Sequence, residues 1–285
     1  MSTTAHTPGA AWEPLTPRGV AAFARASLGR LLVVQLLVAV LAGGVVVWVV
    51  HGDLFPVVRL AIQQLPPDGE IRGGQFAWHG DTPVQLAGNH WLSLRVDLTH
   101  SGKLGREAQL EVEFGREDFR VLLPLGYYIV HDYPSQSRLP FNQTELGPWW
   151  GAWQQALLAG AGILVILGLL ASWTILATLY CVPGWMIAFL EDRDLKLLQS
   201  WRLAGAALMP GALFLTCGIF AYGLGLVDLP ELAVLWILHF MVGWAYLAIS
   251  PLFLPKREVK AGNTNPFAGA TPGPAAKSED GKAGA

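Results

Sequence analysis

The run LLVVQLLVAVLAGGVVVWVV, residues 31–50, decides the fold of this chain of 285 residues. It contains no charged residue. As a helix it would span roughly 30 Å, the thickness of the hydrocarbon core of a bilayer. The run is too long for a signal peptide, and Trp48, His51 and Asp53 stand where a small-residue cleavage site would lie. We therefore expect an uncleaved transmembrane helix.

Composition and three later apolar runs extend this prediction to four transmembrane helices. Hydrophobic residues make up 53% of the chain and charged residues only 14%, against about 25% charged residues in soluble domains. The net charge of −2 leaves no basic surplus for nucleic-acid binding. Besides helix 1 over residues 31–50, we expect helices over residues 154–180, 203–227 and 231–250, within a helical region 149–254.

Prolines mark the expected limits of these helices. Pro148 precedes the second helix, and Pro183 is expected to break it before residues 185–190 continue along the membrane surface. Pro210 should bend the third helix to allow close packing, with a moving hinge as the alternative. The tail over residues 255–285 is rich in Gly, Pro and Ala and is expected to be disordered.

Basic residues in the short segments set the expected orientation. Residues 1–30 are expected to form a tail and an amphipathic helix at the membrane surface, with Thr16 as N-cap and Pro17 at the first helical position. Basic residues occur in this segment, in the connector before the third helix and at Lys256, whereas the turn at residues 228–231 has none. The positive-inside rule then predicts that both termini are cytoplasmic.

Residues 51–148 are expected to form a small extracytoplasmic α+β domain, inserted between helices one and two. Helical spacing at residues 54–65 predicts one helix. Alternation at residues 92–98 and 108–114 predicts two strands, and the turn residues between them predict an antiparallel pair. Further strands are expected at three places: residues 69–78, 83–86 and 119–123. The predicted fold is membrane α-helical with a mainly antiparallel sheet in this domain.

The sequence offers only weak candidates for a ligand site. His79, His131 and Asp132 combine imidazole and carboxylate groups that could bind a metal. They lack the close spacing of a metal motif, so surface histidines are the alternative and we expect no metal. His239 lies inside the fourth helix, where an ionisable residue is costly. It could respond to protons or ligands, or simply form a hydrogen bond with a neighbouring helix.

Neither the motifs nor the cysteines indicate catalysis. Asp97 and the hydroxyl residues up to Ser101 resemble half of an aspartic-protease site, but one such loop is insufficient, and a hydrogen-bonded turn is the expected structure. The two cysteines, Cys181 and Cys217, lie outside residues 51–148, so no disulfide holds that domain. We expect no enzyme activity and no cofactor.

Small residues four apart predict close helix contacts. Ala39 and Gly43 form one such face, and Ala207 and Gly211 form another. Besides the lipid bilayer, the expected partners are a second copy of the chain or another membrane protein, bound through these faces.

The order of segments resembles a bacterial family of polytopic membrane proteins, domain of unknown function eleven eighty-nine, or a cousin of it. The best-matching segments lie within QQLPPDGEIRGG at residues 63–74 and LRVDLTHSGK at residues 94–103. This chain departs from the family in its Trp content and its long Ala/Gly/Pro tail. The resemblance implies a multi-pass protein of the bacterial inner membrane, and some members are linked loosely to maltodextrin utilisation.

Three functions follow as hypotheses. The first is a non-catalytic protein whose extracytoplasmic domain binds, senses or docks. The second is an accessory component of a membrane transport system, with sugar as the suggested cargo. The third is a membrane enzyme, for which the sequence shows no nucleophile or acid/base pair.

Overall fold

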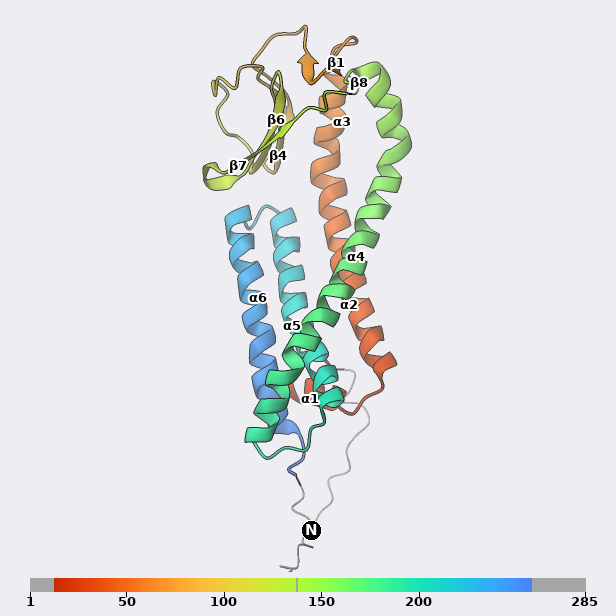
Figure 1. The fold of residues 1–285 in the computed structure, drawn as a ribbon, viewed down its shortest axis with the longest axis vertical. Helices are drawn as coiled ribbons and strands as arrows, with labels where there is room; N and C mark the ends of the chain where they lie inside the picture. The colour runs from red at the N-terminus through yellow and green to blue at the C-terminus, as the bar shows by residue number, and fades with distance from the viewer. Residues whose placement is uncertain (1–12, 137, 258–285) are drawn as a thin grey trace, which may run out of the picture.

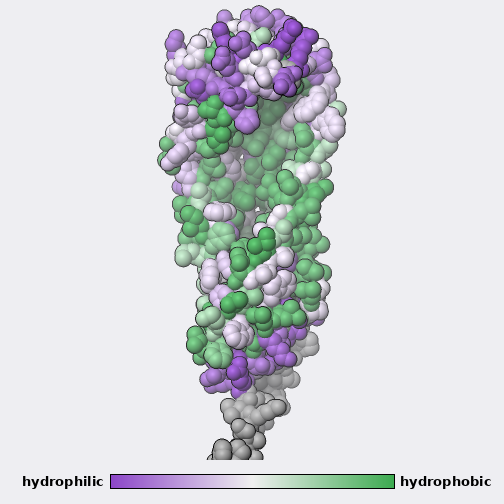
Figure 2. All heavy atoms as spheres, in the orientation of Figure 1, coloured by the Kyte–Doolittle hydropathy of each residue, from purple (hydrophilic) through white to green (hydrophobic). Residues whose placement is uncertain are grey.

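The computed structural model describes residues 13–136 and 138–257. The expected disorder of residues 258–285 lies outside this part of the chain. Four helical segments in the described chain are long and apolar enough to cross a membrane, as the sequence predicts. Figure 2 shows hydrophobic residues over the middle of the molecule, between hydrophilic residues at its two ends.

The first long segment is one uninterrupted rod of 36 residues, Leu28–Gln63. It consists of α2 (Leu28–Val49), the π-helical turn η2 (Val50–Leu54) and α3 (Phe55–Gln63). At 1.5 Å per residue the rod is about 54 Å long, so it continues well beyond a membrane. The predicted boundary at His51 is therefore wrong for the helix. The backbone N–H of Phe55 bonds to the carbonyl of Val50, and this wider turn carries the chain into Pro56 without a break.

The second rod is α4 (Gln143–Leu190), a helix of 48 residues. Asn142 caps it by accepting a hydrogen bond from the N–H of Glu145 at 2.9 Å. Both Pro148 and Pro183 lie inside the helix, so the predicted break at Pro183 is wrong. Prolines are tolerated where neighbouring helices and hydroxyl groups satisfy the backbone. Near Pro183, the Ser200 hydroxyl donates to the Cys181 carbonyl at 2.7 Å.

The two remaining long helices, α5 (Leu197–Gly223) and α6 (Leu229–Ile249), are shorter and form a pair joined by a tight turn. Of the most apolar stretch, 61% is buried in α5 against 11% in α6, so α5 is central to the bundle. The turn that joins them lies level with the middle of the two rods, whereas α3 and the start of α4 rise past it (Figure 1).

The short helix α1 (Pro17–Phe23) packs under the bundle. Thr16 accepts a hydrogen bond from the N–H of Gly19 at 3.0 Å, which confirms the predicted cap. Val20 and Phe23 are fully buried, and α1 contacts α5 and the 3-10 turn η4 (Ser250–Phe253). The apolar side of this helix is thus covered by the chain itself, and not by lipid as the amphipathic pattern predicts. The start and end of the described chain lie together at this end (Figure 1).

Residues 66–142, which we call the sheet domain, lie at the opposite end. Its larger sheet has the order β3-β4-β5-β6-β7. The strands are β3 (Val84–Gly88), β4 (Leu92–Val96), β5 (Leu110–Phe114), β6 (Asp118–Leu122) and β7 (Tyr128–Asp132). Strands β4 and β5 pair in parallel, Leu92 beside Leu110 and Val96 beside Phe114, so the predicted antiparallel pair is wrong. Residues 97–109 form a loop that runs back along the sheet and not a hairpin turn.

A smaller antiparallel sheet has the order β2-β1-β8. It consists of β1 (Glu70–Arg72), β2 (Gln75–Ala77) and β8 (Arg138–Pro140), which leads into α4. Phe76 in β2 lies at the centre of the domain core. Its ring centroid is within 5.2–6.4 Å of four other aromatic rings: Trp78, Phe114, Tyr133 and Phe141.

Candidate binding site

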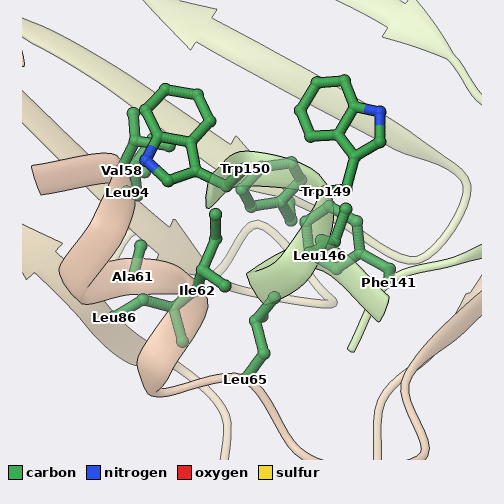
Figure 3. A pocket seen from close by; sticks show the side chains of 11 residues that line it. Val58, Ala61, Ile62, Leu65, Leu86, Leu94, Phe141, Leu146, Trp149 and Trp150 are labelled. Atoms are coloured by element: carbon green, nitrogen blue, oxygen red, sulfur yellow. The ribbon is translucent and has the colours of Figure 1, made fainter. Parts of the chain in front are cut away.

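An apolar pocket of about 200 Å³ lies where α3, α4 and the sheet domain meet. Figure 3 shows side chains of the two helices facing one another across it. The helices line it with Val58, Ala61, Ile62, Leu146, Trp149 and Trp150, and Leu65 follows α3. The sheet domain adds Leu86, Leu94, Phe114 and Phe141. No lining residue carries a charge, so the pocket is suited to an apolar ligand.

Trp150 places a buried, unpaired polar group in the wall of the pocket. Its ring packs edge-on against Phe55 with centroids 4.8 Å apart, and only 9% of the residue is exposed. Its indole N–H is buried and has no hydrogen-bond partner among the described residues. An unpaired buried donor costs about 1–3 kcal/mol. A ligand with an acceptor group beside its apolar part would remove this cost.

An exposed apolar surface on α4 leads from the pocket toward the candidate membrane spans. Trp153, one turn after Trp149 and Trp150 on α4, is 53% exposed. Leu157 and Leu164 continue the exposed apolar surface along α4. Because α4 continues without a break into a candidate membrane span, this surface extends from the hydrophobic middle of the molecule to the pocket.

A second contact fixes the sheet domain on the turn between α5 and α6. The side chain of Gln109 donates to Asp228 Oδ1 at 2.7 Å and accepts from the N–H of Leu229 at 2.8 Å. His90 Nε2 lies 3.2 Å from the same Asp228 oxygen. The indole N–H of Trp91 donates to the carbonyl of Tyr222 at 3.1 Å. We call these contacts the latch.

The latch has a counterpart on the first rod. The side-chain amide of Asn89 donates to the backbone carbonyl of Asp53, in the π turn, at 2.6 Å. The turn between β3 and β4 therefore touches both α5–α6 and α2–α3. A shift of the sheet domain would therefore disturb its contacts with α2–α3 and with α5–α6.

The polar face of the larger sheet is also buried. Arg95 on β4 lies 3.2 Å from Glu111 and 2.7 Å from Glu113 on β5, and each of these side chains is at most 5% exposed. His100 extends this group, with Nδ1 2.5 Å from Glu113 and Nε2 2.5 Å from Asp118. We call these five residues the ion cluster. It lies under the loop of residues 97–109, where Arg95 also donates to backbone carbonyls.

Gly115 makes room for the histidine of the ion cluster. A Cβ atom at this position would lie 2.2 Å from His100 Nε2, so a larger residue would displace the ring. Among the described residues, no group of three or more His, Cys, Asp or Glu side chains is arranged to hold a metal.

The loop that starts at Asp97 is a hydrogen-bonded turn, as predicted. Asp97 accepts bonds from the Ser101 hydroxyl at 2.8 Å and from the Thr99 N–H at 3.2 Å. Burial raises the pKa of the Asp97 carboxyl, but these bonds and one from the Gly102 N–H outweigh burial. The pKa therefore lies below its ordinary value. Ser101 is used as a donor to this carboxylate.

The histidines singled out from the sequence lie apart from the pocket. His79 lies on the surface, 3.4 Å from Asp68. His131 on the exposed strand β7 packs its ring against Phe119, with centroids 5.5 Å apart, and Asp132 is exposed beside it. These positions fit surface histidines, the alternative to a binding site.

His239 on α6 turns toward its own helix. Its Nδ1 contacts the carbonyl of Trp236, one turn earlier, and its ring lies 3.9 Å from that of Phe240. The predicted hydrogen bond is thus formed within α6 and not with a neighbouring helix. His239 lines neither the pocket nor the latch.

The small-residue faces pack inside the chain. A Cβ atom on Gly211 would lie 2.4 Å from the carbonyl of His239, so α5 and α6 touch at their backbones. One on Gly43 would lie 3.0 Å from Ile166 of α4. Ala39 and Ala207 are at most 1% exposed. Neither face is free for a partner, which removes the sequence argument for association through them.

Comparison of the chain with family models, curated proteins and solved structures found no match. The resemblance to domain of unknown function eleven eighty-nine therefore stays a prediction.

Sequence reasoning missed the pocket, the latch and the ion cluster. Each joins segments that are far apart along the chain, such as Ala61 with Trp150 or Gln109 with Asp228. One signal was available for the ion cluster: Arg95 on one strand and Glu111 and Glu113 on the next share an alternation phase. Opposite charges at such positions suit paired strands.

Proposed function

We propose that this chain is a non-catalytic protein of the bacterial inner membrane that binds one apolar chain of a lipid or lipid-like amphiphile. The apolar pocket between α3, α4 and the sheet domain carries the proposal. In this arrangement both termini are cytoplasmic and the sheet domain is extracytoplasmic, which the basic residues near the termini favour.

The size and lining of the pocket support an apolar ligand. An engineered apolar cavity of about 150 Å³ stays dry and binds benzene, and this pocket is larger, about 200 Å³. Water would find only the indole N–H groups as partners in the pocket, whereas a stable buried water needs two to four. An apolar chain would fill the space and regain the lost van der Waals contacts.

The position of the pocket favours a lipid chain over a soluble ligand. The exposed apolar surface at Trp153 and Leu157 would guide a chain from the bilayer without passage through water. The unpaired N–H of Trp150 could then bond to an ester or carboxyl oxygen. The binding site would therefore sample molecules that partition into the outer leaflet.

The latch supports a role in sensing. A ligand in the pocket contacts α3, α4 and the sheet domain, and the latch joins that domain to the turn between α5 and α6. A ligand shifts an equilibrium only by binding one state more tightly. Separation of α3 from α4 by an inserted chain would provide that difference.

Filling the pocket tests the proposal. The full chain is purified in mild detergent, and native mass spectrometry counts the lipids that it retains. Ala61→Phe should abolish the retained lipid because the ring occupies the pocket. Leu60→Phe, at the exposed neighbouring position, is the matched control and should retain lipid as the unchanged chain does.

A stability measurement supports the count. Added lipid at about 100 times its Kd should raise the free energy of unfolding by about 2.7 kcal/mol, seen as a higher Tm, in the unchanged chain and in Leu60→Phe only. Should Ala61→Phe be misfolded, Val58→Trp fills the same space from another position. Equal lipid retention by a folded pocket variant would contradict the proposal.

A further inference from the structure

The turn between β6 and β7 exposes more apolar surface than its surroundings explain. Residues 123–128, the β6–β7 tip, read LPLGYY, with no charge. Leu125 is 85% exposed, the largest value among the exposed large hydrophobic residues of the described chain. Tyr127 and Tyr128 are 70% and 60% exposed. Exposure of this apolar surface to water is unfavourable. Its position relative to the helices shows what else could cover it.

The sheet register places this tip at the helix end of the sheet domain. Strand β5 begins beside the latch, since the N–H of Leu110 donates to the carbonyl of Trp91 at 2.9 Å. Strand β6 runs antiparallel to β5 with Leu122 opposite Glu111. The end of β6, and the turn after it, therefore lie at the same end of the strands as the latch.

The same end of the strands faces the outer ends of α5 and α6. The latch contacts the carbonyl of Tyr222 and the N–H of Leu229, at the end of one helix and the start of the other. Figure 1 shows the turn at β7 on the helix side of the sheet domain, above the start of α6. Where these two helices leave the hydrocarbon core, the lipid headgroups begin.

The turn between α5 and α6 marks the same level by its own composition. Leu224 and Leu226 are 51% and 73% exposed there, next to the polar latch. Leucine and tyrosine side chains side by side with polar groups are typical of the membrane interface, where tyrosine is enriched. The tip and this turn thus present the same chemistry at one level of the molecule.

The backbone of the tip fixes its shape. Leu125 has φ of 65° and Gly126 has φ of 86°, and a leucine rarely adopts this left-handed conformation. The turn is held at its base because the Arg106 guanidinium donates to the carbonyl of Leu123. Arg120 packs over the ring of Tyr128 at 5.8 Å. The strained leucine is thus held outward.

We infer that the β6–β7 tip inserts into the headgroup region of the leaflet next to the sheet domain. Leu125 and Tyr127 contact lipid there, while the latch contacts protein. The sheet domain is then held at one end of its strands by two contacts, one with lipid at the tip and one with protein at the latch. This inference depends on the helices crossing a membrane and is independent of any ligand in the pocket.

A fluorescent probe at the tip tests the inference. In the full chain with Cys181→Ala and Cys217→Ala, Leu125→Cys is labelled with an environment-sensitive dye and placed in nanodiscs of phosphatidylethanolamine and phosphatidylglycerol. We expect a blue shift of the emission, loss of quenching by iodide and quenching by headgroup spin-labelled lipid. Glu117→Cys, exposed on the β5–β6 turn at the opposite end of the strands, is the control and should remain open to iodide.

The spin-labelled lipid separates a lipid cover from a protein cover. Protection from iodide without quenching by headgroup spin-labelled lipid would mean that protein covers the tip, as in pairing of β7 between two copies, and would overturn the inference. Equal iodide access at both positions in nanodiscs would overturn it as well.

Discussion

In the central strands β4 and β5 of the larger sheet, the two faces are both covered, but by different chemistry. On one face Leu94, Val96 and Phe114 pack toward α3, α4 and the domain core. On the other face Arg95, Glu111 and Glu113 pair with one another under the loop of residues 97–109. The alternating pattern on its own predicts one face in the core and one in water. The comparison teaches that alternation reports a difference in polarity and not a difference in exposure.

The two faces should also differ in how they fail. An apolar side chain that is trimmed leaves a cavity, and the cost scales with the atoms removed. A buried charge that loses its partner leaves an uncompensated charge, which costs more. Changes on each face, with exposed controls, would measure this difference directly.

The largest effect is expected for Arg95→Ala. It leaves Glu111 and Glu113 buried without their shared cation, and should lower the free energy of unfolding by about 3–5 kcal/mol. The measurement is denaturant unfolding of the full chain in mild detergent. Arg138→Ala is the control because this pair with Glu70 is at the surface, with the arginine 72% exposed. The control should lose no more than about 1 kcal/mol, and equal losses would contradict the prediction.

A smaller effect is expected on the apolar face for Val96→Ala. Val96 is fully buried, and at about 0.8 kcal/mol for each methyl group plus a cavity term the loss should be about 2 kcal/mol. Val130→Ala, on β7 and 41% exposed, should change stability by no more than about 0.5 kcal/mol. A loss at Val96 as large as that at Arg95 would show that the two faces do not differ.

The smallest effect, about 1.5 kcal/mol at neutral pH, is expected for Asp97→Asn. The amide keeps one acceptor oxygen and loses the charge that strengthens the bonds from Ser101 and Gly102. The folded-state pKa of Asp97 is depressed, so its contribution is complete above the unfolded value of about 3.9. That contribution is lost as the pH falls through the folded pKa.

The pH dependence provides the check on this last prediction. The difference in unfolding free energy between the unchanged chain and Asp97→Asn should narrow as the pH is lowered below about 4. Measurements of Tm for both proteins at a series of pH values would show it. A difference that stays constant down to acid pH would mean that the charge of Asp97 contributes nothing.

Much of the fold follows from local patterns. The four apolar spans, the cap at Thr16 and strands close to β3, β4, β5 and β6 are predicted by hydropathy and alternation. The sequence predicts the ends of the helices less well. A run of apolar residues shows where lipid can cover a helix, but a helix ends where its hydrogen bonds end. Rods such as Leu28–Gln63 therefore continue past the point at which the sequence becomes polar.

The site required information that no local pattern contains. The parallel pairing of β4 and β5 depends on the path of residues 97–109, whose turn-forming residues also suit a hairpin. The pocket depends on how Trp150 and Ala61 meet after two separate rods have left the bundle. Histidines drew attention by their chemistry, yet His79 and His131 lie on the surface, while His100 became part of the ion cluster.

The π turn at Val50–Leu54 sets the rotational phase between the two halves of the first rod. A residue advances an α-helix by about 100°, and the π turn takes up one residue more than an α turn does. The face of α3 that meets Trp150 is therefore rotated by about that angle from where a regular helix would direct it. Deletion of Gly52 would remove that extra residue, so a regular α-helix would still carry Ala61 on the face that meets Trp150, and the pocket and the latch should survive the deletion.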